Sequence, residues 1–234
     1  MREGQIIITG ASKGIGAAIA EELDHRGYRV VCVSRSGEAP VGLGKVCDMA
    51  DEAAVTDLIA DIARAGPIIG LVNNAGLHLS DPTQNLTTDE YNRVMQINAT
   101  AVMIASREAY VHLKETAGKI VNIGSFFDKL GVPANLAYCA SKAAVAAMTR
   151  CMAVEWADDG ITAVNIAPGY IETDLNKDFL ARENIQNWLA KRVPLARPGQ
   201  AEEVARIVGA LYSENIGFLT GETIYLDGGQ GMNH

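Results

Sequence analysis

Tyr138 and Lys142 are the two residues whose types and spacing point most directly to chemistry. They lie four positions apart in a segment, residues 137–142, whose pattern predicts a helix, so both side chains fall on one helix face. An ammonium group near a phenol favours the phenolate and lowers the tyrosine pKa from its ordinary value of about 10. A tyrosine tuned in this way can donate or accept a proton near neutral pH. Taken alone, the pair is equally typical of an ordinary helix surface.

Two further polar residues belong to the same candidate catalytic set. Ser125 follows a predicted strand at residues 119–123, and a hydroxyl at the carboxyl end of a strand can hydrogen-bond a substrate oxygen. Asn98 is a polar residue within an otherwise apolar helical segment. It is either a buried amide with all its hydrogen bonds satisfied or the centre of a kink whose freed carbonyl holds a relay water.

A glycine-rich turn, residues 9–16, follows the first predicted strand and begins the first predicted helix. Its three glycines have the spacing G-x-x-x-G-x-G, which permits a tight turn and a close approach of the backbone to a pyrophosphate. Free N–H groups at the start of the helix add a partial positive charge. The turn therefore predicts a dinucleotide site. Its predicted contacts are Gly10, Ser12, Lys13, Gly14, Ile15 and Gly16.

The end of the second predicted strand bears on the type of dinucleotide. An acid there would bind the ribose hydroxyls and repel a 2′-phosphate, but Ser34 is followed here by Arg35, and the first acid is Glu38. Arg35 can donate a pair of hydrogen bonds to a phosphate, and Lys13 in the glycine turn can approach the same phosphate. The sequence predicts NADP(H) in preference to NAD(H). The alternative is that both cations are solvated surface charges.

The elements that must position these residues alternate along the chain. Continuous runs rich in Val and Ile indicate strands covered on both faces, hence a parallel sheet. The predicted strands are Gln5–Thr9, Arg29–Val33, Leu43–Cys47, Ile68–Asn73, Lys119–Ile123, Ile161–Ile166 and Thr223–Leu226. The predicted helices lie at about Gly14–Arg26, from Asp51, after Thr87 (in capping-box spacing with Glu90), at about Ala137–Ala157 and from about Gln200.

This alternation predicts an α/β, doubly wound Rossmann fold, with a seven-stranded parallel sheet and helices on both faces. No linker or repeat divides the chain, so we expect one domain over residues 1–234. A polar, amphipathic insertion at about residues 174–199 interrupts the rhythm before the last strand. Its position over the carboxyl ends of the strands makes it either a substrate lid or a plain surface helix pair. Its apolar residues are Phe179, Leu180, Ile185, Trp188 and Leu189.

Composition limits the partners. Twenty Lys+Arg against 28 Asp+Glu give a net charge of −8, which disfavours nucleic acid and anionic membranes. No apolar stretch is long enough to span a membrane, and the N-terminus lacks the pattern of a signal peptide. The four cysteines form no C-x-x-C pair and predict a reducing cytoplasm, with Cys32 and Cys47 as buried thiols. The histidines show no ligand spacing, so no metal is expected.

With these motifs in one order from Gln5 to Gly229, the sequence resembles a short-chain dehydrogenase/reductase. Residues 9–16 resemble the cofactor turn of that family, residues 73–76 resemble its N-N-A-G segment, and Asn98, Ser125, Tyr138 and Lys142 resemble its catalytic tetrad. The resemblance adds cofactor contacts near adenine, along the cleft and at the nicotinamide. These are Asp48, Met49, Asn74, Ala75, Gly76, Tyr138, Lys142, Pro168, Gly169, Ile171 and Thr173.

The resemblance implies hydride transfer between a nicotinamide and a ketone or aldehyde carbonyl, reversible to the alcohol. Tyr138 would then exchange the proton with the carbonyl oxygen, which Ser125 polarises. Lys142 would bind the nicotinamide ribose and lower the Tyr138 pKa, and Asn98 would support a relay water. A homotetramer or homodimer is also implied. An NAD-dependent alcohol or polyol dehydrogenase and a cofactor-binding sensor without turnover are the alternatives.

Within the family, the sequence is most similar to the bacterial 3-oxoacyl-carrier-protein reductase type, through residues 194–199 and 226–229. Where that type has basic residues to dock its acidic carrier, this chain has Thr116 and the segment 158–160, Asp-Asp-Gly. The departure and the net charge count against the carrier, so a small ketone, a sugar or polyol, and a diffusible aldehyde stand as alternatives to the carrier-bound 3-oxoacyl group. Five apolar residues near Ser125 and Tyr138 have two interpretations: they form an apolar wall beside the substrate, or they only pack the loop. These residues are Phe126, Phe127, Val132, Pro133 and Leu136. Asp128 and Lys129 either reach a polar substrate group or face water.

Overall fold

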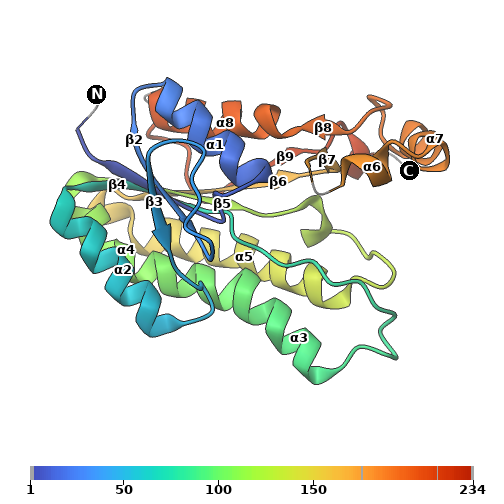
Figure 1. The fold of residues 1–234 in the computed structure, drawn as a ribbon, viewed down its shortest axis with the longest axis horizontal. Helices are drawn as coiled ribbons and strands as arrows, with labels where there is room; N and C mark the ends of the chain where they lie inside the picture. Colours follow the sequence, from blue (N-terminus) through green and yellow to red (C-terminus); the bar gives the residue numbers. More distant parts are fainter. Residues whose placement is uncertain (1–2, 175, 215, 233–234) are drawn as a thin grey trace.

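The computed structural model describes residues 3–174, 176–214 and 216–232, and its centre is a seven-stranded parallel sheet. The strand order is β3-β2-β1-β4-β5-β6-β9 (Figure 1). This confirms the predicted fold class. The strands are β1 Gln5–Thr9, β2 Arg29–Ser34, β3 Leu43–Val46, β4 Ile68–Asn73, β5 Lys119–Ile123, β6 Thr162–Pro168 and β9 Thr223–Leu226.

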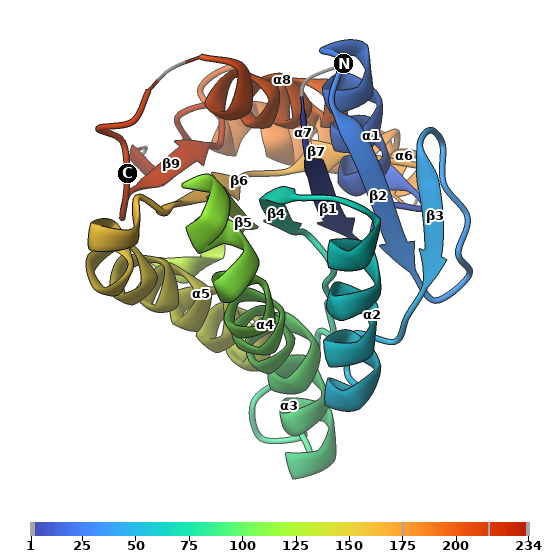
Figure 2. The same ribbon diagram turned by 90° about the vertical axis from the view of Figure 1, so that its left-hand side faces the viewer.

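Helices cover both faces of the sheet (Figures 1 and 2). On one face lie α1 (Gly14–His25) and α8 (Ala201–Ser213), which pack against each other. On the other face lie α2 (Glu52–Ala65), α4 (Ala101–Thr116) and α5 (Leu136–Glu155). The strand order reverses direction between β1 and β4, and such a switch point leaves a crevice at the carboxyl ends of the strands.

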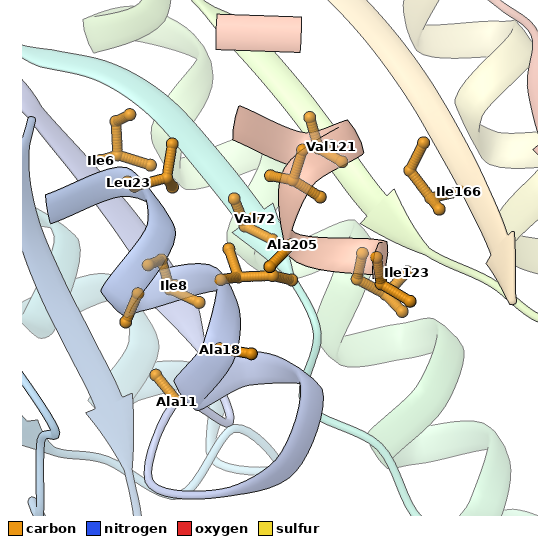
Figure 3. Packing of buried hydrophobic residues seen from close by; sticks show 14 of the residues in the cluster. Ile6, Ile8, Ala11, Ala18, Leu23, Val72, Val121, Ile123, Ile166 and Ala205 are labelled. Carbon is orange, nitrogen blue, oxygen red and sulfur yellow. The ribbon is translucent and has the colours of Figure 1, made fainter. Parts of the chain in front are cut away.

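Alternation along each strand divides the core into two parts. Ile6 and Ile8 of β1 face α1 and α8, whereas Ile7 between them faces α2 and α4. All three are fully buried, which explains why the strand reads as one continuous apolar run. Figure 3 shows the part on the α1 side. Its labelled residues are Ile6, Ile8, Ala11, Ala18, Leu23, Val72, Val121, Ile123, Ile166 and Ala205.

The helical segment after Thr87 is interrupted around Asn98, where one of the two interpretations of the sequence placed a kink. It consists of α3 (Thr88–Met95), a π-helical turn η1 (Gln96–Thr100) and α4. The predicted capping box is confirmed: Thr87 Oγ1 accepts from Glu90 N at 3.2 Å, and Glu90 Oε2 accepts from Thr87 N at 3.0 Å. Asn98 lies in the middle of this π-helical turn. The turn contains one residue more than an α-helical turn, so the side chains of α4 are shifted around the helix axis relative to those of α3.

The insertion contains two short helices, α6 (Lys177–Leu180) and α7 (Glu183–Arg192), at one end of the sheet (Figure 1). A second, two-stranded sheet closes its base, where β7 (Ile171–Glu172) pairs with β8 (Gly199–Gln200). That sheet was not predicted, because two-residue strands carry no periodic pattern. Residue 175 and the side chain of Phe179 lie outside the described part of the chain. Of the described helices, none has the length and apolar character needed to cross a membrane.

The two-sided core predicts a contrast between two valines. Val121→Ala, fully buried on β5, is expected to lower the free energy of unfolding by about 2 kcal/mol, because it removes two buried carbons and leaves a cavity. Val154→Ala, exposed on α5, is expected to change it by less than about 0.5 kcal/mol, since it loses no packing. Urea denaturation at one fixed protein concentration measures both, and equal losses would contradict the described core.

Candidate active site

A cleft of about 1050 Å³ lies at the carboxyl ends of the central strands. Its lining includes every residue that the sequence analysis named as a cofactor contact, drawn from the turns after β1, β2, β3, β4 and β6 and from α5. Ser125 also lines it. The structure thus brings together residues that are far apart in sequence. Their roles in binding and catalysis stay predictions.

The glycine turn has the geometry that an anion needs. Gly10 has φ +66°, and a Cβ there would lie 2.8 Å from the Ala75 Cα. A Cβ at Gly16 would overlap the Gly10 carbonyl oxygen and the Asn74 amide. Lys13 caps α1 without a side-chain hydrogen bond, and the first turn of α1 holds no acid. The N–H groups that begin α1 are therefore left for a ligand, and the residues present fit a pyrophosphate.

Asn74 fastens this turn to the next strand. Its Nδ2 donates to the carbonyl oxygens of Thr9 and Gly10, each at 3.0 Å. In return, Thr9 Oγ1 accepts from the backbone N–H groups of Asn74 and Ala75, each at 3.0 Å. Four hydrogen bonds therefore hold the N-N-A-G segment against the glycine turn across the switch point.

The adenine end of the cleft carries most of its charge. Ser34 Oγ accepts from Gly37 N at 3.0 Å and so fixes the turn that follows β2. Asp48 Oδ1 accepts from Ala50 N at 3.0 Å, which leaves its second oxygen for a ligand. Arg35 and Lys13 are exposed, and within the described ranges neither forms an ion pair. Both are available to one phosphate.

At the opposite end, the segment after β6 closes over the glycine turn. Gly169 N donates to Leu226 O at 2.9 Å, and a Cβ at Gly169 would lie 2.7 Å from the Asp227 Cα. A Cβ at Gly14 would lie 3.5 Å from Thr173 Cγ2, so Thr173 faces the glycine turn at van der Waals distance. A ligand on the turn is therefore bracketed by the base of the insertion.

Lys142 is the one buried cation of the cleft lining as described. Its Nζ donates to Ile123 O at 2.8 Å and faces no carboxylate in the described structure. Burial lowers the pKa of Lys142 to about 8, because the charged form is desolvated. A Cβ at Gly76 would lie 3.9 Å from this Nζ, an ordinary van der Waals distance, so the N-N-A-G segment passes directly beside the ammonium.

Tyr138 lies on the same face of α5, with Lys142 Nζ 5.7 Å from its ring centroid. The expected lowering of its pKa is wrong for this structure. Burial raises the pKa of Tyr138, and a hydrogen bond with Ser125 lowers it by less. The reason is geometric: the ammonium donates to Ile123 O, and Phe127 packs edge-on against the phenol ring at 5.8 Å.

Ser125 begins the short 3₁₀ helix η2 (Phe126–Asp128) at the end of β5. Its Oγ accepts from Phe127 N at 3.2 Å. Because that lone pair is occupied, the hydroxyl proton can point to the other side, toward Tyr138 or a substrate oxygen. A serine hydroxyl held in this way is oriented to donate a hydrogen bond into the cleft.

Asn98 is fully buried behind the cleft and does not line it. Its Oδ1 accepts from Leu77 N at 2.7 Å, and its Nδ2 donates to Leu77 O at 2.8 Å and to Ser141 Oγ at 3.1 Å. The amide is satisfied, as the first interpretation expects, and it also lies in a π-helical turn, as the kink interpretation expects. Ser141 in turn donates to Tyr138 O at 2.8 Å, so Asn98 reaches the catalytic helix.

Three asparagines that the sequence analysis did not single out as a set support this site. Asn73, Asn122 and Asn165 lie in register on β4, β5 and β6. Asn73 Nδ2 donates to Asn122 Oδ1 at 2.9 Å, and Asn122 Nδ2 donates to Thr149 Oγ1 on α5 at 2.8 Å. The buried Asn165 Oδ1 has no partner among the described residues. We call these three residues the asparagine ladder.

Two of the lining residues that the sequence reasoning did not name, His78 and Tyr170, lie at the Tyr138 end of the cleft. The His78 ring lies 4.7 Å from the Tyr138 ring, and His78 Nε2 lies 2.5 Å from Asn135 Oδ1. Because Asn135 Nδ2 donates to Pro133 O, its Oδ1 must accept from His78. Tyr170 follows Gly169 and also lines the cleft. Their only signal was position: His78 lies two residues after the N-N-A-G segment, and Tyr170 lies between Gly169 and Ile171.

The predicted apolar wall is only partly present. Phe126 and Phe127 line the cleft, but Val132, Pro133 and Leu136 do not. Asp128 and Lys129 are not in the lining either. Asp128 instead accepts from the Tyr225 hydroxyl at 3.0 Å, and Lys129 Nζ lies 3.5 Å from the Tyr225 ring centroid. Both charges are used in packing the loop against β9.

Comparisons with known proteins bear on this arrangement. Residues 10–231 match the family described as Enoyl-(Acyl carrier protein) reductase. The 3-oxoacyl-[acyl-carrier-protein] reductase MabA of Mycobacterium tuberculosis is 35% identical, covering 98% of this chain and 93% of that protein. Gluconate 5-dehydrogenase of Gluconobacter oxydans is 35% identical, covering 95% and 93%. The structure of a gluconate 5-dehydrogenase from Burkholderia cenocepacia in complex with NADP and tartrate is 32% identical, with a TM-score of 0.91 and coverage of 99% and 96%.

The sheet order, the cleft and these matches together define a class of enzyme. The chain belongs to the short-chain dehydrogenase/reductase family. It is an NAD(P)-dependent oxidoreductase that acts on carbonyl or alcohol groups. The predicted family is confirmed, and the alternative of a sensor without turnover is set aside.

The buried ammonium predicts a dependence of stability on pH. Because the pKa of Lys142 is about 8 in the folded protein and 10.5 when exposed, the unfolded chain binds more protons between these values. Stability from this group therefore rises with pH across that window. The free energy of unfolding of wild type minus that of Lys142→Met is expected to rise by about 2–3 kcal/mol from pH 7 to pH 10.

Urea denaturation of the two proteins at both pH values measures this difference. Lys191→Met, at an exposed lysine of α7, is the matched control and should give the same difference from wild type at pH 7 and pH 10. A flat difference for Lys142→Met as well would mean that the ammonium is not desolvated.

Proposed function

We propose that the protein is an NADPH-dependent reductase of a ketone or aldehyde carbonyl, able to run in reverse as an alcohol dehydrogenase. One observation carries the proposal. Ser125, Tyr138 and Lys142 face the same cleft as the glycine turn, at the carboxyl ends of neighbouring strands. A nicotinamide bound there supplies the hydride, and the side chains supply the proton and the orientation.

Tyr138 is the proposed proton donor. Its raised pKa keeps the phenol protonated at neutral pH, which suits an acid that gives its proton to a developing alkoxide. Ser125 is the proposed second donor to that oxygen, because its hydroxyl is oriented by the bond from Phe127 N. In the reverse direction, Tyr138 must lose its proton first, and the hydrogen bond with Ser125 is the described contact that lowers its pKa.

Lys142 and Asn98 are the proposed supporting members of the tetrad. Lys142 would bind the nicotinamide ribose hydroxyls, and its lowered pKa makes it a group that exchanges protons near neutral pH. Asn98 would act behind the cleft. Its bonds to Leu77 and Ser141 support a role in holding the segment after the N-N-A-G motif against α5.

Arg35 and Lys13 are the proposed contacts of the adenosine 2′-phosphate, which is the basis for preferring NADP(H). Both are exposed at the adenine end, and neither is paired within the described structure. One observation favours the alternative of an NAD-dependent dehydrogenase. Glu38 also lines this end, held by a hydrogen bond from Ser36 at 3.4 Å, and its carboxylate would repel a phosphate.

A small diffusible carbonyl compound is the proposed substrate, with a carrier-bound 3-oxoacyl group as the alternative that the name of MabA suggests. On the face where a carrier would dock, Asp159 is paired with Lys114 at 2.8 Å and with Tyr110 at 2.6 Å. The charge of Lys114 is therefore compensated by a carboxylate of this chain. It leaves less positive charge for an acidic carrier.

Assembly and location are proposed from weaker grounds. A homotetramer or homodimer fits the exposed apolar side chains Met103 and Val111 on α4 and Val154 on α5. A cytoplasmic location fits the four free cysteines, of which Cys32 and Cys47 are buried as predicted. One domain is proposed for the chain, with the segment 174–199 as a lid over the cleft.

The proton-donor role predicts the effect of one hydroxyl. Tyr138→Phe is expected to lower kcat/KM for carbonyl reduction by about 10²–10⁴-fold, since general acid catalysis is lost. NADPH binding should persist, because the ring and its packing remain. Tyr91→Phe on α3, outside the cleft lining, is the matched control and should keep full activity. Full activity of Tyr138→Phe would refute the proposed mechanism.

The phosphate contacts predict a change of cofactor preference. Arg35→Asp is expected to raise the KM for NADPH by about 10–100-fold, because a charge-assisted contact is replaced by repulsion. The ratio of kcat/KM for NADH to kcat/KM for NADPH should therefore rise. Initial rates with both cofactors measure the ratio. Arg64→Asp on α2 serves as a control far from the cleft. A wild-type protein that already prefers NADH by tenfold would support the NAD-dependent alternative instead.

A further inference from the structure

Aromatic rings from three parts of the chain adjoin one another beside Tyr138. Phe127 lies edge-on to Tyr138 at 5.8 Å, and Phe126 lies 4.7 Å from Phe127. Tyr170 contacts both phenylalanines, at 5.3 and 6.3 Å. Trp188 of α7 packs edge-on against Tyr170 at 5.3 Å. We call Phe126, Phe127, Tyr170 and Trp188 the aromatic wall.

This wall belongs to the end of the cleft where the reacting carbonyl must lie. Phe126 and Phe127 directly follow Ser125, and Tyr170 directly follows Gly169; all three line the cleft. The phenylalanines are buried, so they form the base of the wall, whereas Tyr170 is half-buried and presents the more accessible ring. A flat apolar group next to the carbonyl would pack against Tyr170.

Charge is distributed unevenly along the same cleft. Of the charged lining residues, Lys13, Arg35, Glu38 and Asp48 belong to the glycine turn and the adenine end. Arg93 lies on α3, three residues before Gln96, whose Nε2 donates to Ala50 O beside Asp48 and Met49. Near Tyr138, the described lining offers only Lys142, which donates to Ile123 O, and the imidazole of His78, which donates to Asn135. Arg192 of α7 does not line the cleft and lies over the Trp188 ring, 5.6 Å from its centroid.

A substrate carboxylate buried at this end would therefore find no unengaged cation in the described lining, and an unpaired buried charge is costly. A chain of hydroxyl groups would find apolar ring faces instead of hydrogen-bond partners. Both arguments disfavour sugar acids and polyols. They favour a carbonyl compound whose second substituent is uncharged, apolar and flat.

We propose that the substrate is an aryl or similarly flat, conjugated ketone or aldehyde, and that Tyr170 is the residue that selects it. The inference rests on the proposed function. In the reaction, the carbonyl carbon receives a hydride from NADPH and its oxygen receives a proton from Tyr138, which leaves the alcohol and NADP⁺. Tyr138 then regains a proton from solvent. Tyr170 also contacts Trp188, so a substituent packed against Tyr170 lies next to helix α7 of the insertion.

The first test compares two matched diketones and two polar probes with the full-length protein and NADPH. 1-Phenyl-1,2-propanedione should have a kcat/KM at least tenfold above that of 2,3-butanedione, in which a methyl group replaces the phenyl ring. It should also exceed 5-keto-D-gluconate and the N-acetylcysteamine thioester of acetoacetate by at least tenfold. A preference for either polar probe, equal use of both diketones, or reduction of no probe while NADPH binds would overturn the inference.

Variants of Tyr170 separate selection from general damage. Tyr170→Leu should raise the KM for the phenyl diketone by about tenfold and leave kcat/KM for 2,3-butanedione within about twofold, whereas Tyr170→Phe should behave as wild type. Phe218→Leu, at a fully exposed ring outside the lining, is the control. Equal losses on both diketones in Tyr170→Leu would make Tyr170 a merely structural residue and contradict the proposal.

A binding measurement removes the dependence on turnover. The chain has two tryptophans, so Trp156→Phe leaves Trp188 as the only tryptophan that fluoresces. Trp156 packs on Tyr110 at 5.1 Å, and phenylalanine keeps an aromatic ring at that contact. Because an alcohol and NADP⁺ are the reactants of the reverse reaction, Tyr138→Phe is combined with Trp156→Phe to suppress turnover. In this double variant with NADP⁺ present, 1-phenylethanol should change the Trp188 emission at concentrations where gluconate does not. The reverse order would overturn the inference. Failure of the proposed function is distinct, since it would appear as absent NADPH binding or as full activity in Tyr138→Phe.

Discussion

The burial of one ammonium group constrains the rest of this site. Lys142 is desolvated beneath the cleft with a single described acceptor, Ile123 O, and burying a charge without a counter-ion is unfavourable. The surrounding structure must therefore enforce its position. Gly76 passes beside the Nζ, and Asn98, buried in a π-helical turn, holds Leu77 next to it by hydrogen bonds. The surrounding backbone holds Lys142 in place, because burial of the ammonium group is itself unfavourable in free energy.

The asparagine ladder explains how the helix that carries Lys142 keeps its register. Asn122 lies three residues before Ser125 on the chain and donates to Thr149, which lies two helical turns after Lys142. Thr149 Oγ1 donates to Val145 O within the same helix. Because Asn73 donates to Asn122, the strand that leads into the N-N-A-G segment is tied to the same network. Buried and satisfied amides of this kind fix relative positions more sharply than apolar contacts can.

Much of this arrangement could be predicted from the sequence, because its signals are local. The continuous apolar strands and the glycine turn specify the sheet and the cofactor end, and Thr87 with Glu90 marked a helix start correctly. The direction of the Tyr138 pKa could not be predicted. It depends on where the Lys142 proton donors point and on the Phe127 ring, which spacing along a helix does not determine. The π-helical turn and the two-residue strands β7 and β8 likewise carry no periodic signal.

The two ends of the cleft were not equally predictable for a physical reason. A pyrophosphate requires close backbone approach and a helix terminus, and few residue patterns provide them, so the cofactor end leaves a recognisable motif. The substrate end is assembled from loops after β5 and β6, where a ring can come from any segment that reaches the cleft. His78 and Tyr170 gain their meaning only when the fold places them beside Tyr138 or on the wall that adjoins it.

The same separation reconciles an acidic protein with an anionic cofactor. The net charge of −8 opposes long polyanions, whose many phosphates would meet the whole surface. A dinucleotide meets only the cleft, whose lining includes Lys13, Arg35 and the N-terminus of α1, and in physiological salt more distant surface charges are largely screened. Local positive charge therefore suffices for the cofactor. The distant end of the cleft does not have to bind phosphate, so rings can line it, and this difference in character along one cleft fits the proposed orientation of a carbonyl compound against a charged cofactor.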